Sequence, residues 1–252
     1  MRTVLFASDK IGVKIAKFLN YKNNPPVALV LDEGDRNGYN NSIIDISGVD
    51  KSLVIYNSKL EEYKTIELLK SLQLDMGILV WWPNIVRKII FDIPKRGIIN
   101  FHPSFLPYNR GKDPYFWSIV DETMYGVTIH SIDEDIDTGG ILVQELIKVD
   151  WEDTSKSLYR KSREKLVTLF KKYYDDIVSG RITPTPQNLR AGSYHCRKDL
   201  EESSRIDFNK KYYAVDLLNL LRAKTFYPHP AAWFEDDDKK YEVHIEIKQV
   251  GK

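Results

Sequence analysis

Two hydrogen-bonding side chains, Asn100 and His102, stand two residues apart at the end of an apolar run. They open the stretch "INFHPSFLPYNRGKDP", residues 99–114. Residues two apart in a strand point to the same side, so both side chains should project together while Phe101 packs on the opposite side. Pro103 restricts His102 to β or polyproline geometry. The sequence therefore predicts a rigidly held amide and imidazole, although such a pair can also do no more than satisfy loop backbone groups.

A carboxylate-rich turn follows in "SIDEDIDTGGIL", residues 131–142. It could be a solvated acidic turn or, because its aspartates alternate, a calcium loop. The calcium interpretation fails because Thr138 and Gln144 occupy the positions of the sharp-turn glycine and the bidentate glutamate. No H-E-x-x-H or paired cysteine motif supports zinc, so we expect no metal. Asp137, which precedes Thr-Gly-Gly, is the carboxylate that could approach a histidine from a neighbouring strand.

An asparagine amide, a histidine and an aspartate together suit acyl transfer to an amine. His102 can remove the proton of the attacking amine. Asn100 and a protonated imidazole can stabilise the oxyanion of the tetrahedral intermediate, and a nearby Asp137 favours the imidazolium form. Direct transfer needs no Ser or Cys nucleophile. The sequence has neither G-x-G-x-x-G after the first strand nor G-x-x-x-x-G-K-[ST], which argues against dinucleotide and P-loop sites.

Short buried runs that alternate with helix-period segments must position these side chains. The expected strands are residues 3–7, 27–31, 52–56, 76–80 and 97–100, and one expected helix is 59–72. This alternation predicts an α/β domain with a largely parallel sheet. Ser8 or Asp9 should cap the first helix, and Pro83 and Pro114 should begin later ones. Residues 32–50 are polar and turn-rich, and we expect a mobile surface loop there.

The second half of the chain predicts fewer and less regular elements. A half-exposed strand is expected at 124–132, with a hairpin partner at 139–149. Thr154 should cap a long helix. The apolar face of that helix is expected to comprise Leu158, Leu166, Leu169, Phe170, Tyr173 and Ile177. Residues 180–188 look like a linker, so we expect one domain at 1–188 and a small C-terminal α+β subdomain at 189–252, with one helix near 212–223 and a final strand pair.

Composition narrows the classes of protein. The 252 residues include 37 basic and 36 acidic ones, for a formal charge of +1, which argues against a strong electrostatic surface for nucleic acid. Cys196 is the only cysteine, so no intrachain disulfide can form and a reducing cytoplasm is the expected location. No apolar stretch approaches ~18 residues, and the first residues lack a signal-peptide core, so no membrane span is expected.

The two motifs together resemble the signatures of the folate-dependent formyltransferases. Residues 100–114 match N-x-H-P-S-x-L-P-x-x-R-G-x-x-P, and "IDEDIDTGGIL" resembles the second signature with its D-T-G. The resemblance covers roughly residues 1–235. It implies a Rossmann-like catalytic domain with helices on both faces of the sheet, 10-formyltetrahydrofolate as the formyl donor, and a triad carried onto Asn100, His102 and Asp137.

The resemblance also implies where the folate binds. In the family the folate lies against the segment after the fourth strand and against the turn before the triad aspartate. These positions correspond to Trp82, Asn84, Ile85 and Val86, and to Asp133, Glu134, Asp135 and Ile136. Lys112 stands where a basic residue often contacts the cofactor. Without the family, "VWWPNIV", residues 80–86, would be interpreted as a strand end with core aromatics.

The acceptor has to be inferred from the rest of the chain, whose tail resembles both sugar N-formyltransferases and methionyl-tRNA formyltransferases. Only 19 residues follow Trp233, too few for the complete C-terminal β-barrel of the tRNA enzymes. The near-zero charge is also unlike a tRNA binder. "FASDKIG", residues 6–12, looks like the amino-sugar enzymes. We therefore expect a UDP- or dTDP-linked amino sugar, formylated for surface-glycan biosynthesis, and no nucleic acid or membrane partner; the small C-terminal segment is compatible with a homodimer.

Binding the acceptor's diphosphate and pyrimidine requires basic and aromatic side chains. The candidates are Lys10, Arg222 and Lys224 for the diphosphate and Phe226 or Tyr227 for the pyrimidine, followed by Arg197 and Lys198 as weaker ones. The same residues could form a solvated basic face beside core aromatics. Two other functions stay open: transfer to initiator tRNA or a small ribonucleotide amine, and non-catalytic binding of folate or a nucleotide sugar. The sequence does not decide the sugar, its amine position, or UDP against dTDP.

Overall fold

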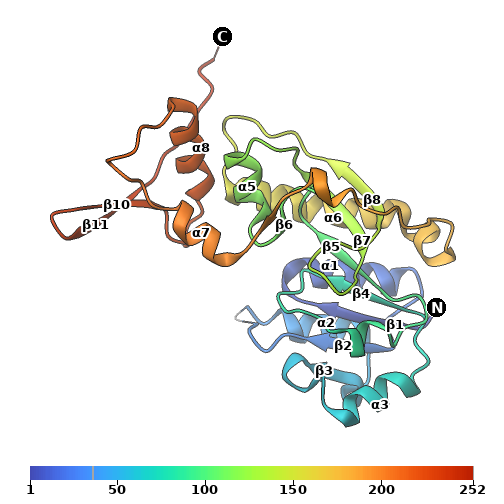
Figure 1. The fold of residues 1–252 in the computed structure, drawn as a ribbon. Coiled ribbons are helices and arrows are strands. Elements are labelled where there is room, and N and C mark those ends of the chain that lie inside the picture. The colour runs from blue at the N-terminus through green and yellow to red at the C-terminus, as the bar shows by residue number, and fades with distance from the viewer. Residues whose placement is uncertain (36, 252) are drawn as a thin grey trace. The chain divides into compact units, whose positions relative to one another are not determined.

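The computed structural model describes residues 1–35 and 37–251, which form two compact units. The first unit comprises residues 1–102, 129–143 and 166–187, and the second comprises 103–128, 144–165 and 188–252. Figure 1 labels most of the helices and strands of both. The boundary expected at residue 188 between a catalytic domain and a C-terminal subdomain stays a prediction.

A seven-stranded sheet has the order β3-β2-β1-β4-β5-β7-β8 (Figure 1). Its strands are β1 Thr3–Ala7, β2 Ala28–Leu31, β3 Val54–Tyr56, β4 Met76–Val80, β5 Ile98–His102, β7 Gly126–Ser131 and β8 Ile141–Leu146. The pairs β1–β2, β2–β3, β1–β4 and β4–β5 are parallel. The predicted α/β fold with a mostly parallel sheet is therefore confirmed, and the first five strands lie within two residues of their expected ends.

Helices pack against both faces of the part of the sheet that belongs to the first unit. They are α1 Asp9–Tyr21, α2 Tyr39–Ser47, α3 Tyr63–Ser71, α4 Lys88–Phe91 and the second half of α6 Ser155–Ser179, with short 3₁₀ turns at Lys51–Leu53 and Asn57–Lys59. Ile66 and Leu69 of α3 share a buried cluster with Phe6 of β1. Phe101 of β5 instead meets Phe170 of α6, with ring centroids 5.0 Å apart.

The expectation of a mobile loop over residues 32–50 is wrong for the second half of this range, which forms α2. This helix lies between Gly38 and Gly48, both with left-handed φ angles, 72° and 62°. Ile43 is fully buried, and α2 packs against α1. One buried side of a two-turn helix is hard to recognise in so polar a segment. Arg36, also in this range, lies outside the described residues.

Two further expectations for the first unit are corrected. Pro83 does not begin a helix, because α4 starts only at Lys88. Ser8 does stand at the N-cap of α1, but its hydroxyl donates to the Trp81 carbonyl and makes no capping bond. The serine therefore links the end of β1 to the end of β4 instead of closing its own helix.

The second unit has its own core around α5 and α8. Its elements are β6 Arg110–Gly111, α5 Pro114–Val120, the 3₁₀ turn Leu189–Ala191, β9 Tyr194–His195, α7 Arg197–Ser203, α8 Ala214–Lys224, β10 Ala232–Asp236 and β11 Lys239–Val243. Phe116, Tyr125, Leu158 and Leu220 belong to one buried cluster. Pro114 begins α5 as predicted, and the paired strands β10 and β11 confirm the final strand pair.

Several details of this half differ from the expectation. A second helix, α7, precedes α8; it is short and charged, and Asp199 accepts a hydrogen bond from the Cys196 N–H at 2.6 Å. β7 is buried from Gly126 to His130 instead of half-exposed. On α6, Tyr174 and not Tyr173 is on the buried face. β6 pairs with β9, and a side chain at Gly111 would lie 2.3 Å from the His195 carbonyl oxygen.

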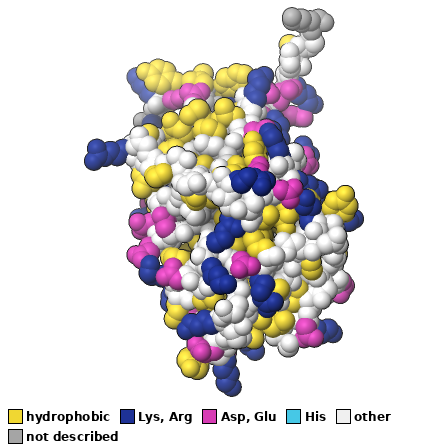
Figure 2. All heavy atoms as spheres, turned by 90° about the vertical axis from the view of Figure 1, so that its right-hand side faces the viewer, with side chains coloured by type: hydrophobic (Ala, Val, Ile, Leu, Met, Phe, Trp, Pro, Cys, Tyr) yellow, Lys and Arg dark blue, Asp and Glu magenta, His cyan; other side chains and the backbone are white. Residues whose placement is uncertain are grey.

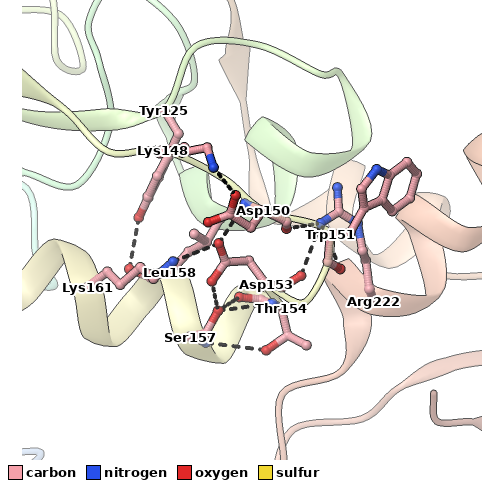
Figure 3. Close-up of polar contacts among 10 residues, drawn as sticks. All are labelled: Tyr125, Lys148, Asp150, Trp151, Asp153, Thr154, Ser157, Leu158, Lys161 and Arg222. Carbon is pink, nitrogen blue, oxygen red and sulfur yellow. Dashed lines mark hydrogen bonds and ion pairs between the residues drawn. The ribbon is translucent and has the colours of Figure 1, made fainter. Parts of the chain in front are cut away.

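A polar network joins the start of α6 to α8 within the second unit (Figure 3). The buried Asp153 carboxylate accepts hydrogen bonds from Ser157 Oγ at 2.6 Å and Lys161 Nζ at 2.7 Å. Thr154 Oγ1 accepts from the Ser157 N–H at 3.3 Å, which confirms the predicted cap. The Arg222 guanidinium donates to the carbonyl oxygens of Asp150 and Asp153, at 2.8 and 3.2 Å. The network gives buried charges the partners that they require.

Replacing Asp153 tests this network. Burial raises the pKa of Asp153, but its bonds from Lys161 and Ser157 outweigh burial and hold the pKa below 3.8. Asp153→Asn should lower the free energy of unfolding at pH 7 by about 1.5–3 kcal/mol, as for other hydrogen bonds to a charged group. Because the folded-state pKa is depressed, the loss should be full above pH 3.8 and fade as the pH falls through the folded-state value.

The measurement is urea unfolding of wild type and variant between pH 3 and 7. Glu67→Gln is the matched control, since Glu67 forms an exposed ion pair with Lys70 and should change the free energy by less than about 0.5 kcal/mol. A variant as stable as wild type at pH 7 would contradict the assigned role of Asp153.

Candidate active site

Strand register places Asn100 and His102 on one side of the sheet. Asn100 is level with Leu79 of β4, and Leu79 is level with Phe6 of β1. Their side chains therefore share the face on which α3 packs, while Phe101 points to the opposite face against α6. His102 is the last residue of β5 and is buried. The predicted orientation, with Asn100 and His102 on one face and Phe101 on the other, is confirmed.

The turn before β8 brings Asp137 to the same place. Asp137 Oδ1 accepts a hydrogen bond from Asn100 Nδ2 at 3.3 Å, and Oδ2 lies 3.5 Å from His102 Nδ1. The aspartate side chain is only 12% exposed. The structure thus brings together the three residues that the sequence singled out, although they lie up to 37 residues apart in the chain.

A fourth polar side chain, His130, belongs to the cluster and was missed. It lies in β7, and its Nε2 is 3.2 Å from Asn100 Nδ2 and 3.5 Å from Asp137 Oδ1. Its Nδ1 is 2.7 Å from the Ser131 carbonyl oxygen. A single histidine within a strand that was expected to be half-exposed did not indicate a functional residue. The adjacency of β5 and β7, which the sequence did not reveal, brings it into contact.

Backbone contacts hold the turn that carries Asp137. The aspartate has a left-handed φ of 55°. Gln187 Nε2 donates to the carbonyl oxygens of Asp137 and Gly139, at 2.9 and 2.6 Å. A side chain at Gly139 would lie 1.9 Å from the Ser131 carbonyl oxygen, so only glycine fits there. The segment expected as a linker therefore also supports the turn; Thr185 in it pairs with Ile141.

The segment after β4, expected to contact folate, presents an aromatic side chain with an unsatisfied donor. The Trp82 ring packs edge-on against Phe6, with centroids 5.6 Å apart. Among the described residues, no acceptor faces the buried Trp82 indole N–H. Asn84 donates to Asp32 at 3.0 Å, Val86 is buried in the core, and Ile85 is 74% exposed. The buried indole N–H is out of reach of a ligand, so in this segment the exposed Ile85 is the side chain open to apolar contact with one.

The acidic turn that was also expected to contact the folate is exposed to solvent. Asp133, Glu134, Asp135 and Ile136 are all exposed. Asp133 accepts a hydrogen bond from Thr138 Oγ1 at 2.6 Å, and Glu134 pairs with Lys88 at 2.8 Å. Over residues 1–35 and 37–251, no group of three His, Cys, Asp or Glu side chains is arranged to hold a metal ion.

The second unit contains a cavity of about 600 Å³ lined by basic and aromatic side chains. Four basic residues face two carboxylates in its wall. The lining includes Lys112, Arg197, Lys224 and Lys240, the acids Asp113 and Glu201, and the rings of Tyr115, Phe116, Phe226, His229 and Trp233. Burial lowers the pKa of Lys224, and the charges of Asp113 and Glu242 partly offset it. The cavity can accept an anion joined to a flat ring.

The other expected acceptor residues lie elsewhere. Arg222 is 7% exposed, and its guanidinium bonds to the Asn219 side chain. It also contacts the 150–153 backbone and the Trp151 ring (Figure 3). Lys10 is exposed in the first unit, and Tyr227 is exposed beside the cavity residue Phe226. That Lys10, Arg222 and Tyr227 bind a diphosphate or a pyrimidine stays a prediction. For Arg222, its contacts within the protein argue against that role. Lys112, expected at the folate, lines the cavity with Lys224.

Comparison with known proteins assigns the family. Residues 5–172 match the family model described as formyl transferase, and residues 199–249 match the N-formyltransferase dimerization C-terminal domain. The chain therefore belongs to the formyl transferase family, as the two motifs indicated.

Curated relatives differ in their acceptors. Methionyl-tRNA formyltransferase from Lachnospira eligens is 28% identical over 250 residues, 96% of this chain and 78% of the relative. The dTDP-4-amino-4,6-dideoxyglucose formyltransferase from Mycobacterium tuberculosis is 36% identical over 138 residues, 55% of this chain and 58% of the relative. The chain also spans only 60% and 37% of the length of two further relatives.

Solved structures share the fold over the full chain. A 4-N formyltransferase from Francisella tularensis has a TM-score of 0.82 and 25% identity, covering 99% of both chains. An N-formyltransferase from Helicobacter canadensis, solved with folinic acid and dTDP-3-aminofucose, has a TM-score of 0.70 and 22% identity over 95% of this chain and 86% of that one. The second likeness bears on the fold alone.

Proposed function

We propose that this protein transfers the formyl group of 10-formyltetrahydrofolate to the amine of a UDP- or dTDP-linked amino sugar. The observation that carries this proposal is the cluster of Asn100, His102 and Asp137, with contacts of 3.3 and 3.5 Å, in a chain of the formyl transferase family. A role in surface-glycan biosynthesis and a cytoplasmic location belong to the same proposal. Over residues 1–35 and 37–251, no helix is long and apolar enough to cross a membrane.

In the proposed reaction the acceptor amine attacks the formyl carbon directly. Asp137 faces Nδ1 of His102, and we assign the proton transfer to the other ring nitrogen, Nε2. His102 takes one proton from the amine, the bond between the formyl carbon and folate N10 breaks, and the proton is returned to N10. Asn100 is placed to donate to the oxyanion that develops on the formyl oxygen. Atoms and charge balance without a metal or a covalent enzyme intermediate.

The folate is assigned to the first unit. The partly exposed Trp82 ring and the exposed Ile85 would supply apolar contact. The formyltransferase from Anoxybacillus kamchatkensis, 26% identical and with a TM-score of 0.57 over 80% of this chain, was solved with tetrahydrofolate, which supports a reduced folate as the donor. The exposed acidic turn before Asp137 would border the donor and contribute backbone groups more readily than its carboxylates, because folate is itself anionic.

The nucleotide part of the acceptor is assigned to the cavity of the second unit. Lys224 and Lys112 would pair with the diphosphate, and Phe226 would stack on the pyrimidine. An anion beside Lys224 would compensate the burial that lowers the pKa of that amine. Figure 2 shows acidic and basic side chains interspersed on the face drawn, which gives that face no single-sign surface for tRNA.

Methionyl-tRNA is the second candidate acceptor, because the Lachnospira eligens relative aligns over 96% of this chain. The two acceptors differ in salt dependence. Binding of tRNA through several phosphates weakens steeply with salt, whereas a single diphosphate in a cavity depends on it much less.

We also propose a homodimer formed through residues of the matched dimerization domain. There Phe234 stacks on Tyr241, with ring centroids 5.3 Å apart, and meets Phe208 at a tilt, with centroids 4.7 Å apart. Phe208 is 64% exposed. An aromatic cluster this open is typical of a surface covered by a partner.

The triad assignment is tested by replacing its members. His102→Ala and Asp137→Ala should each lower kcat for formyl transfer at least about 100-fold, because the proton acceptor or its partner is lost. A mass-spectrometric assay with 10-formyltetrahydrofolate and a panel of UDP- and dTDP-linked amino sugars measures turnover. His244→Ala, at an exposed histidine, is the control. Near-wild-type turnover in either triad variant would refute the mechanism, and formylation of methionyl-tRNA alone would refute the acceptor.

The cavity assignment makes a separate prediction. Lys224→Met and Phe226→Leu should each raise KM for the nucleotide sugar about 10-fold, the effect of losing roughly 1.4 kcal/mol of binding. KM for the folate should stay unchanged, as should both constants in the control Lys64→Met, at an exposed lysine of α3. An unchanged acceptor KM in both cavity variants would place the nucleotide elsewhere.

The dimer is tested by its mass in solution. Wild type should have twice the monomer mass by light scattering, and Phe208→Ser with Tyr241→Ser should produce monomers, because the apolar area that drives association is lost. Tyr21→Ser, at a tyrosine 81% exposed on α1, is the matched control and should remain dimeric. A monomeric wild type at micromolar concentration would rule this surface out.

A further inference from the structure

His130 is a buried side chain of the site that the proposed chemistry does not use. It is 1% exposed, and its ring contacts both Asn100 and Asp137. A ring buried this completely has to be satisfied by fixed neighbours. We propose that His130 is a positioning residue, which sets the amide of Asn100 and the carboxylate of Asp137 for formyl transfer. The inference rests on the proposed function and extends it to a residue outside the triad.

The contacts of His130 define its tautomer. Nδ1 lies 2.7 Å from the Ser131 carbonyl oxygen, and a carbonyl can only accept. Nδ1 therefore carries a hydrogen and donates it. In the neutral ring Nε2 is then a lone-pair acceptor, and the donor that faces it is Asn100 Nδ2 at 3.2 Å. The backbone of β7 thus orients the imidazole toward Asn100.

Asn100 directs its amide hydrogens at two partners. Nδ2 lies 3.2 Å from His130 Nε2 and 3.3 Å from Asp137 Oδ1, and it has two hydrogens to donate. The opposite orientation would place the amide oxygen against a carboxylate and a lone pair. The bond to Asp137 is charge-assisted and the stronger of the two. The hydrogen held by His130 is therefore the one that the developing oxyanion can take over.

The same ring limits the freedom of Asp137. Oδ1 lies 3.5 Å from His130 Nε2, while Oδ2 lies 3.5 Å from His102 Nδ1. The two imidazole rings stand nearly perpendicular, at 87°, with centroids 6.1 Å apart. Because Nε2 is a lone-pair acceptor, its approach to Oδ1 is not a hydrogen bond; Asn100 Nδ2, 3.2 Å from Nε2 and 3.3 Å from Oδ1, is the donor between the two. By fixing that amide, His130 helps to hold Oδ1 on Asn100 and so keeps Oδ2 toward His102.

Two substitutions separate the contact with the site from the contact with the backbone. His130→Asn keeps a donor near the Nδ1 position for Ser131 but has no group at Nε2. His130→Gln places an amide at the Nε2 position and lacks the Nδ1 donor. Both variants are assayed with wild type for kcat and for KM of each substrate, and thermal unfolding measures the fraction folded.

We expect kcat to fall at least about 10-fold in His130→Asn and no more than about 3-fold in His130→Gln, since misplacement of reacting groups costs rate and not affinity. KM for donor and acceptor should change less than about 2-fold in both, because His130 is buried and binds neither. A structural role alone would lower the folded fraction without this difference between the variants.

Equal kcat in the two folded variants, or wild-type kcat in His130→Asn, would overturn the proposal. If His130→Asn does not fold, the glutamine variant decides: kcat near wild type supports the proposal, and a loss of 10-fold or more overturns it. A wild-type protein without turnover on any acceptor would overturn the proposed function, and this inference with it.

Discussion

A carboxylate that is shielded from water needs hydrogen-bond donors around it, and Asp137 is the carboxylate of the site that has this requirement. At 12% exposure it retains little hydration, and an unpaired charge in such a position is costly. One oxygen is met by the Asn100 amide and the other by the His102 ring. Both donors come from β5, and the turn that carries Asp137 follows β7, the neighbour of β5 in the sheet. The order of the strands therefore brings hydrogen-bond donors to the Asp137 carboxylate, and the carboxylate in turn orients those donors.

The turn that presents Asp137 is specified by backbone geometry more than by side chains. Its left-handed φ, the absence of space for a side chain at Gly139, and the bonds from Gln187 all act on the main chain. The exposed acids before it can vary without moving the carboxylate, because their contacts are with solvent and with Lys88 and Thr138. The backbone of the turn therefore determines where Asp137 lies, and the exposed acids before it affect only its surroundings.

Period-two alternation was sufficient to predict from sequence that Asn100 and His102 point together and that Phe101 faces away. The family motif then supplied Asp137, which the alternation alone left as one acid among four. His130 and Gln187 escaped prediction because each acts through strand or backbone pairing that no local pattern encodes. Arg222 was expected to bind the diphosphate of the acceptor, although it lies in a run of buried residues from Asn219 to Ala223 on α8. Its partners are backbone carbonyls some 70 residues earlier, and a sequence does not reveal such contacts.

The pairing of β6 with β9 has a consequence for synthesis of the chain. Arg110 and Gly111 belong to the first motif, but their strand partner, Tyr194 and His195, comes about 80 residues later. A nascent chain released as far as residue 187 contains the whole triad and still lacks the strand that completes the motif's loop. The loop can reach its final hydrogen bonding only after the C-terminal segment has left the ribosome. In the order of synthesis, that segment finishes the motif and is not an appendage added to a completed domain.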